Sequence, residues 1–196
     1  TFSWQKSLGG EGGHGVIVLS PRAIERLQTH KPNWPLPKIF RLTKGTNLID
    51  GIFTGETINT PSMLCVEDYL FSLEWAKSVG GIEGLIERSK NNAKIIFDFV
   101  KDTPWLSYLA YEEKNRSHTS VCLSLNDPRI KDLKSFIKAL VVRLEKESVA
   151  FDIGSHREAP PGLRVWCGPT VEQSDIKSLM PWIKWAFEKE LIEQNK

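Results

Sequence analysis

The stretch SVCLSLNDPRIKDLKSFIKALVVRLEKESVAFDI, residues 120–153, decides the fold class of this chain. Residues 120–125 predict a strand, residues 133–146 predict a helix, and residues 149–153 predict a second strand. Residues 163–167 then predict a third strand, and residues 171–190 predict a closing helix. Strands and helices that alternate in this way form a compact α/β layer unit.

Two long helical patterns precede this unit. Thr60 and Pro61 combine a side chain that caps a helix with a residue suited to the first helical position, and the pattern that they open stops at Gly80 and Gly81. A second pattern follows, from residue 82 to residue 102. A long helix between two differently organised halves favours a domain boundary near residue 90.

The first sixty residues are punctuated by glycine and proline. A glycine cluster at residues 9–15 precedes the apolar run of residues 16–19, which predicts a buried strand. Ser20 and Pro21 predict the start of a short helix, which a proline cluster ends. Residues 39–58 predict short strands and turns with functional loops among them.

Composition excludes several classes of protein. The chain of 196 residues is 40% hydrophobic and 26% charged, which is typical of a soluble globular protein. Because 26 basic residues face 24 acidic ones, the formal charge of +2 does not indicate a nucleic-acid or membrane-surface partner. Every apolar run is far shorter than the ~20 residues of a membrane span.

The cysteines and histidines predict no metal site and no disulfide framework. Cys65, Cys122 and Cys167 lie far apart without a CxxC pair, and the histidines lack the spacing of metal ligands. A reducing, cytoplasmic setting is the expected one. Residues 1–6 contain neither an initiator methionine nor a signal peptide, so we expect the chain to begin within a longer protein.

The glycine cluster contains a formal G-x-G-x-x-G match at Gly10, Gly12 and Gly15. A dinucleotide fingerprint requires a strand before the glycines and a helix after them, and here a strand-like run follows. No Gly-Lys-Ser/Thr follows either, which excludes a P-loop. The glycines are therefore interpreted as positions for tight turns and close backbone approach.

Three positions have both a chemical and a purely structural interpretation. Lys6 could form a Schiff base if burial leaves its amine neutral, or it could be a solvated surface charge. Asn59 and Thr60, ahead of Pro61, could bind a phosphate at a helix N-terminus, or they could simply start the helix. Arginines on a Pro/Gly-shaped loop, residues 156–164, could clamp a planar anion or could be solvated.

Four motifs occur in a fixed order: SWQK at residues 3–6, LGGEGGHG at 8–15, PLPKIFR at 35–41 and ETINTPSM at 56–63. With these motifs the chain resembles the phosphoserine aminotransferases, in the subgroup with a glycine-rich loop after the lysine. That family belongs to the fold-type I pyridoxal-phosphate enzymes, and the resemblance covers essentially the whole chain.

The resemblance implies an α/β fold that is the C-terminal part of a fold-type I aminotransferase. Residues 1–90 would form the end of the large cofactor-binding domain with its linking helix, and residues 91–196 would form the small α/β domain.

The resemblance also implies the cofactor, pyridoxal 5'-phosphate, and the residues that bind it. Lys6 would form the internal aldimine and carry a proton between Cα of the substrate and C4′ of the cofactor. Gln5 would contact the cofactor phosphate or ring. Asn59 and Thr60 would reach the cofactor phosphate of the neighbouring subunit in a homodimer.

Substrate-binding residues follow from the same resemblance. Arg164 would clamp the α-carboxylate of the substrate, and His156 and Arg157 would lie beside its phosphate. The loop between Arg157 and Arg164 is one residue longer than in other branches of the family, a departure that concerns the position of Arg157.

The implied reaction transfers the amino group between O-phospho-L-serine and 2-oxoglutarate, giving 3-phosphohydroxypyruvate and L-glutamate in serine biosynthesis. The residues that stack on the cofactor ring and pair with its pyridine nitrogen cannot be assigned in this chain. We therefore expect the chain to be the lysine-bearing C-terminal half, with the N-terminal half of the same enzyme as its partner.

Alternatives are a catalytically silent fragment that acts only as a partner of its missing half, and another fold-type I transaminase or desulfurase. A desulfurase is disfavoured because Cys167 lies in a predicted strand and Cys65 in a predicted helix.

Overall fold

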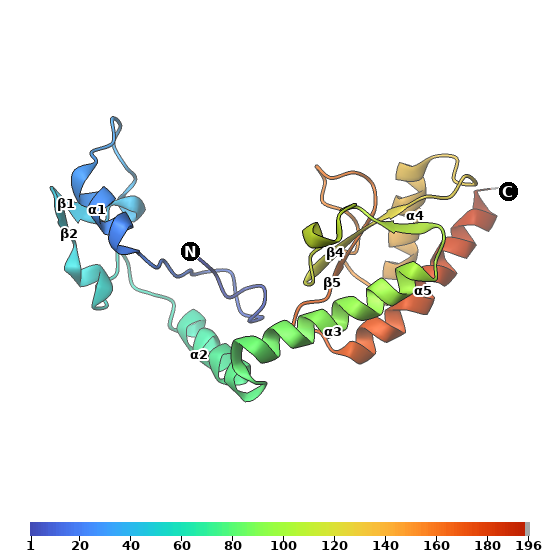
Figure 1. Ribbon diagram of the computed structural model, residues 1–196, viewed down its shortest axis with the longest axis horizontal. Helices are drawn as coiled ribbons and strands as arrows, with labels where there is room; N and C mark the ends of the chain where they lie inside the picture. The colour runs from blue at the N-terminus through green and yellow to red at the C-terminus, as the bar shows by residue number, and fades with distance from the viewer. Residues whose placement is uncertain (195–196) are drawn as a thin grey trace. The chain divides into compact units, whose positions relative to one another are not determined.

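The computed structural model describes residues 1–194, and the chain divides between Leu73 and Glu74 into two units (Figure 1). The division falls inside helix α2 (Met63–Ser78). The domain boundary expected near residue 90 falls inside the next helix, α3 (Gly81–Lys101), and for the complete enzyme it stays a prediction.

The N-terminal unit contains short elements joined by long connections. They are α1 (Pro21–Thr29), the 3₁₀ turns η1 (Lys38–Phe40) and η2 (Asp50–Phe53), the strands β1 (Thr43–Lys44) and β2 (Asn47–Leu48), and the first part of α2. The hydroxyl of Ser20 accepts a hydrogen bond from the Ala23 amide at 3.2 Å, and Pro21 opens α1, so the predicted start is confirmed. β1 and β2 pair antiparallel across a turn in which Gly45 has a φ of +66°.

The buried strand predicted at residues 16–19 is wrong. Only Val16 pairs, through reciprocal backbone hydrogen bonds with Phe2 at 3.1 and 2.8 Å. Ile17 and Val18 are 55% and 75% exposed. An apolar run becomes a buried strand only inside a sheet whose two faces are covered by other elements, and the sheet described within residues 1–73 is the two-stranded β1-β2, which does not include this run.

The predicted start of α2 is also wrong by two residues. The helix begins at Met63 instead of Pro61. Ser62 occupies the capping position, because its hydroxyl accepts from the Cys65 amide at 3.4 Å and its carbonyl accepts from the Val66 amide at 3.2 Å. Thr60 therefore lies ahead of the cap, since Ser62 is an equally good capping residue nearer to the helix.

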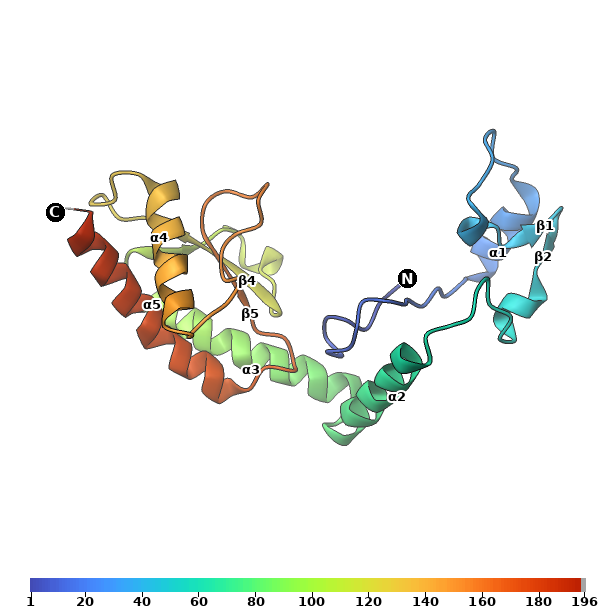
Figure 2. The same ribbon diagram turned by 180° about the vertical axis from the view of Figure 1, so that it is seen from behind.

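The C-terminal unit is a helix-covered antiparallel sheet (Figures 1 and 2). Its elements after α2 and α3 are β3 (Leu106–Tyr108), η3 (Glu113–Asn115), β4 (Ser120–Leu125), α4 (Leu133–Lys146), β5 (Leu163–Trp166) and α5 (Gln173–Glu193). The strands lie in the order β3-β4-β5, and Gly80, with a φ of +101°, separates α2 from α3. The α/β unit predicted for this part of the chain is confirmed.

The strand predicted at residues 149–153 is absent. Ser148 and Asp152 have positive φ values of 57° and 52°, which interrupt an extended backbone on either side of the apolar run. Only the end of the segment pairs with β5: the Ile153 carbonyl accepts from the Arg164 amide at 2.8 Å, and Gly154 forms a bridge with Leu163.

A single hydrophobic cluster fills the space between the sheet and the helices. Alternate residues of β4 and β5 are buried on one face of the sheet, as a period of two requires. They pack on buried side chains of all three long helices, and the ring of Phe187 on α5 stacks on Trp105 with 3.7 Å between centroids. The most deeply buried members are Ala93, Ile96, Leu140, Leu144, Cys167, Ile183 and Ala186.

Asn92 on α3 is 1% exposed and fixes the connection between β5 and α5. Its side-chain amide donates to the carbonyls of Cys167, Gly168 and Val171 at 3.3, 3.2 and 2.7 Å. Buried carbonyls need such a donor, because a carbonyl removed from water without a partner is costly.

We predict that Asn92→Ala lowers the free energy of unfolding by about 1 to 3 kcal/mol, because it leaves these carbonyls without their donor. Urea unfolding followed by circular dichroism measures the change. Asn91→Ala is the matched control, since Asn91 is the exposed neighbour on the same helix and should change stability far less. Equal losses for the two variants would contradict this account of the β5–α5 connection.

Candidate active site

Lys6 occupies the first position of a tight turn in the N-terminal unit. The Lys6 carbonyl accepts from the Gly9 amide at 3.1 Å, and Gly9 has a φ of +72°. The side chain of Lys6 is exposed, and among residues 1–194 its amine makes no hydrogen bond or ion pair. The turn therefore leaves this primary amine exposed to solvent.

The glycines after Lys6 allow its loop to fold closely. A Cβ atom at Gly10 would lie 2.6 Å from the Trp4 ring, and one at Gly12 would lie 2.9 Å from Oε1 of Gln5. At Gly10 the neighbouring indole is buried, so this position requires glycine for space, whereas the exposed Gln5 side chain could move away from a Cβ atom at residue 12. The interpretation of the cluster as a site of close backbone approach is thus confirmed. Gln5 accepts a hydrogen bond from the Ser3 hydroxyl at 2.6 Å, and its amide group is left available.

Asn59 and Thr60 lie on the exposed segment that leads into α2. The backbone carbonyl of Asn59 accepts from the Thr57 hydroxyl at 2.6 Å. Neither the Asn59 amide nor the Thr60 hydroxyl makes a side-chain hydrogen bond within the described part of the chain. Both are available to a ligand, although neither caps the helix, and no hydrogen bond joins them to Lys6 in that part of the chain.

Arg164, His156 and Arg157 share one hairpin in the C-terminal unit. Residues 153–155 pair with residues 162–164, and the Ser155 amide donates to the Gly162 carbonyl at 3.1 Å. The loop between them carries His156, whose Nδ1 accepts from the Glu158 amide at 3.3 Å. Arg157 is 85% exposed and lies 3.8 Å from the Glu158 carboxylate.

Arg164 is the most constrained of the predicted substrate-binding residues. Its neighbours Leu163 and Val165 are buried, so the alternation of the strand directs Arg164 to the opposite face of the sheet. One terminal nitrogen of its guanidinium donates to the Asp152 carboxylate at 2.8 Å. The other edge of the fork is left for a second planar anion.

The sequence did not predict the roles of two further residues, one in each unit. Asp152 pairs with Arg164 from a position of positive φ, and Trp4 is buried two residues before Lys6. Asp is one of the few residues besides glycine that adopt a positive φ, and this is the only local signal at Asp152. No local signal marks the burial of Trp4, because its partner Tyr69 lies far along the chain.

The cysteines are poorly placed for nucleophilic chemistry. Cys167 is fully buried, and this burial raises the pKa of its thiol to about 11. Cys65 is buried at the N-terminal end of α2, as predicted, and Cys122 is half-buried on β4. No group of His, Cys, Asp or Glu among residues 1–194 could hold a metal ion, and no helix in that range is long and apolar enough to cross a membrane.

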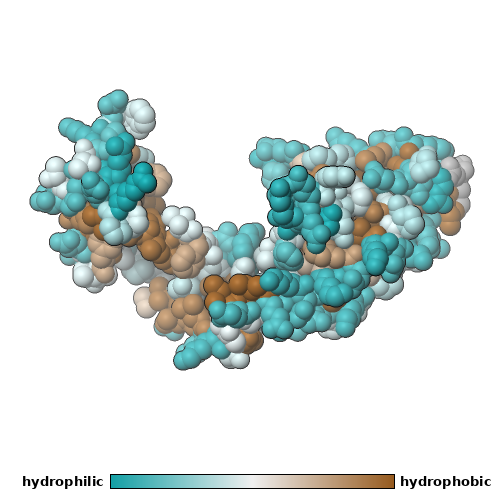
Figure 3. Space-filling model, in the orientation of Figure 1, coloured by the Kyte–Doolittle hydropathy of each residue, from teal (hydrophilic) through white to brown (hydrophobic). Residues whose placement is uncertain are grey.

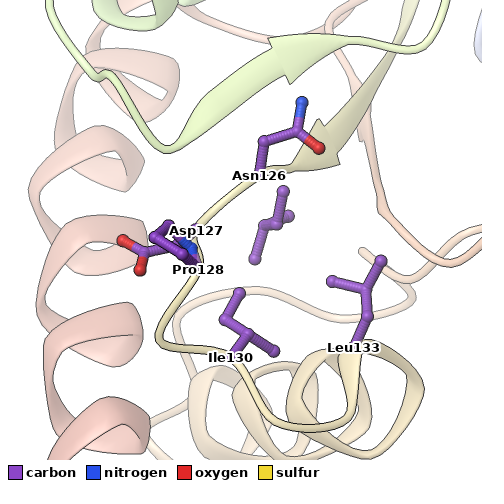
Figure 4. A pocket seen from close by; sticks show the side chains of 6 residues that line it. Asn126, Asp127, Pro128, Ile130 and Leu133 are labelled. Atoms are coloured by element: carbon purple, nitrogen blue, oxygen red, sulfur yellow. The ribbon is translucent and has the colours of Figure 1, made fainter.

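A pocket beside the β4–α4 connection lies apart from these residues (Figure 4). Ile130 and Leu133 form its apolar floor, and Arg129 holds the Asp127 carboxylate at 2.6 Å. The hydrogen bond from Arg129 lowers the pKa of Asp127. None of the predicted site residues lines this pocket, so it is not the candidate active site.

Solved structures that resemble this chain define its fold. A phosphoserine aminotransferase from a study of radiation damage to the Schiff base has a TM-score of 0.62 at 19% identity, over 78% of this chain and 40% of the other. A PLP-bound phosphoserine aminotransferase from Trichomonas vaginalis has a TM-score of 0.56 at 19% identity, over 65% of this chain and 34% of the other. The chain thus has part of the fold-type I aminotransferase fold, as expected.

Sequence relatives are much closer. The phosphoserine aminotransferase of Methanosarcina barkeri is 54% identical over 95% of this chain, and that of Methanosarcina mazei is 53% identical over 96%. No family model matches the chain. This chain is therefore a homologue of the phosphoserine aminotransferases, which confirms the resemblance, and it spans about half the length of these relatives.

We predict that iodoacetamide at pH 8 modifies Cys122 well before Cys167. With a pKa of about 11, only about one Cys167 in 1000 is a thiolate at pH 8, and the reactive fraction rises as the pH approaches 11. Peptide mass spectrometry measures the order of labelling. Unfolding in urea is the control and should make the two cysteines react alike, whereas preferential labelling of Cys167 in the folded protein would contradict its burial.

Proposed function

We propose that this chain is the lysine-bearing part of a phosphoserine aminotransferase. In this proposal the enzyme transfers the amino group of O-phospho-L-serine to 2-oxoglutarate, giving 3-phosphohydroxypyruvate and L-glutamate in serine biosynthesis in the cytoplasm. The observation that carries it is an exposed, unpaired lysine amine on a glycine-shaped turn, in a chain 54% identical to a phosphoserine aminotransferase.

The available groups fit pyridoxal 5'-phosphate. Lys6 offers an amine for a covalent bond, and Asn59 and Thr60 offer unpaired hydrogen-bond donors for a phosphate. When bound, the cofactor supplies an electron sink that makes Cα of the amino acid acidic. Lys6 would hold the cofactor, and its amine would then carry a proton between Cα of the substrate and C4′ of the cofactor. Gln5, adjacent in sequence, would orient the cofactor through its free amide.

Substrate recognition is assigned to the hairpin of the C-terminal unit. Arg164 would bind the α-carboxylate through the edge of its guanidinium that Asp152 does not occupy. His156 and Arg157 would lie beside the phosphate of phosphoserine, since both side chains are exposed on the loop next to Arg164. Their exposure leaves them free to reorient toward an anion.

The proposal includes two partners: the N-terminal half of the same enzyme, and a second subunit in a homodimer whose cofactor phosphate Asn59 and Thr60 would contact. Several large hydrophobic side chains of the N-terminal unit are exposed to solvent (Figure 3). Their exposure supports the proposal that partner chains cover them. The most exposed are Val18, Trp34, Ile39, Phe40, Leu64 and Phe71. A soluble unit rarely leaves so many of them in water.

A desulfurase is the weaker alternative. Such an enzyme needs a mobile, reactive cysteine, and the raised pKa of the buried Cys167 keeps its thiol protonated. Cys65 is buried in a helix, which limits its movement.

We predict that, in the complete enzyme, Arg164→Ala raises the KM of both phosphoserine and 2-oxoglutarate. Both substrates carry the α-carboxylate, and losing a charge-assisted pair of this kind costs about 2 to 5 kcal/mol, or roughly 30-fold and more in affinity. Steady-state kinetics and equilibrium dialysis of the cofactor measure the effect. Cofactor affinity should not change.

Two variants serve as controls. Arg129→Ala removes an arginine that also pairs with an aspartate, away from the hairpin, and should leave both KM values unchanged. The double variant Asn59→Ala with Thr60→Ala should weaken cofactor binding and spare the substrate KM values. If Arg164→Ala released the cofactor and left both KM values unchanged, the proposed division of roles would be wrong.

A further inference from the structure

Trp4 is the only buried side chain among residues 1–64, at 4% exposure, and it lies two residues before Lys6. The backbone around Lys6 belongs to no helix and no strand. Something other than regular secondary structure must therefore hold the lysine in place. The contacts of Trp4 identify the interactions that hold Lys6 in place.

The indole ring of Trp4 stacks on two other rings. Its centroid lies 4.3 Å from that of Tyr69 on α2 at an interplanar angle of 17°, and 5.9 Å from that of His14 at 11°. The indole N–H makes no hydrogen bond in the described part of the chain. Stacking and apolar packing alone thus hold the ring against the helix.

The backbone of the loop that carries Lys6, residues 2–16, is also held by hydrogen bonds, one of them to α2. The Trp4 carbonyl accepts from the Gly10 amide at 3.0 Å, and the Asp68 carboxylate on α2 accepts from the Glu11 amide at 2.8 Å. Phe2 and Val16 close the base of the loop through two backbone hydrogen bonds. Lys6 therefore sits in a closed loop whose one buried anchor is Trp4.

We propose that Trp4 is a positioning residue for Lys6. This inference rests on the proposed function, in which the Lys6 amine must lie within hydrogen-bond reach of two carbon atoms. A displacement of about 1 Å at such a position can cost up to 100-fold in rate. Trp4 touches neither substrate nor cofactor in this role, and it acts by fixing the loop of Lys6 on α2.

The test compares Trp4→Leu with Trp4→Phe in the complete enzyme. Leucine keeps an apolar side chain but loses the aromatic stack, whereas phenylalanine retains a ring that can stack on Tyr69. We expect Trp4→Leu to lower kcat roughly 10- to 100-fold with a much smaller change in KM, and Trp4→Phe to restore most of the loss. Tyr111→Leu is the control, because Tyr111 is an aromatic residue that is 94% exposed and belongs neither to this loop nor to the proposed site.

Hydrogen exchange supplies a readout that does not depend on activity. In the cofactor-free protein, Trp4→Leu should speed the exchange of the Gly9, Gly10 and Glu11 amides, whose acceptors are Lys6, Trp4 and Asp68. Exchange in the β3-β4-β5 sheet should be unchanged. Should Trp4→Leu fail to fold, Tyr69→Leu removes the other ring of the stack and should give the same pattern.

The outcomes separate the two proposals. If the wild-type enzyme transaminates phosphoserine while Trp4→Leu and Tyr69→Leu keep wild-type kcat and exchange rates, the positioning role is wrong and the proposed function stands. If the wild-type enzyme, complete and loaded with cofactor, does not act on phosphoserine, the proposed function fails and the inference fails with it. Equal losses in kcat and exchange protection for Tyr111→Leu would also overturn the assignment.

Discussion

The alternation of side chains along β5 is the constraint on which the C-terminal unit depends. Leu163 and Val165 are 1% and 3% exposed in the core, and Arg164 between them lies on the opposite face of the sheet. The pairing of Cys122 with Arg164 sets this register. A slip of one residue would bury the guanidinium and expose the two apolar residues, so the packing that stabilises the sheet also places the proposed carboxylate clamp.

The N-terminal unit is organised differently. Its described residues bury only Trp4, Cys65 and Ser72, whereas the C-terminal unit has a continuous core that joins a sheet to three helices. Few buried contacts imply a low local free energy of opening. The loop of Lys6 therefore depends on specific contacts with α2, and the proposed partners would supply the burial that the unit lacks.

The sequence predicted helices and strands well where the local residue pattern agreed with the tertiary packing of the same segment. Ser20 with Pro21 predicted the start of α1, and the helices and β4 of the C-terminal unit were found close to their observed bounds. Apolar runs were misleading at residues 16–19 and 149–153, because an apolar run becomes a strand only with pairing partners and a compatible backbone. The positive φ values of Ser148 and Asp152, on either side of the apolar residues of the second run, were not predicted.

The site was predictable to a similar extent. Motif order along the chain pointed to Lys6, Asn59 and Thr60, and the resemblance implied Arg164. The structure leaves these side chains exposed or half-exposed, and their roles stay predictions. The contacts of Trp4 with Tyr69 and of Asp152 with Arg164 could not be predicted, since they depend on tertiary contacts and backbone angles that no local pattern encodes.

The identity of the lysine that binds the cofactor is the most direct test of this account. Borohydride reduction of the complete, cofactor-loaded enzyme, followed by peptide mapping, should place a pyridoxyl adduct on the peptide that contains Lys6. Lys38 and Lys44, in the same unit, should carry none. An adduct on another lysine, or no adduct on this chain, would contradict the central claim that the turn at Lys6 presents the catalytic amine.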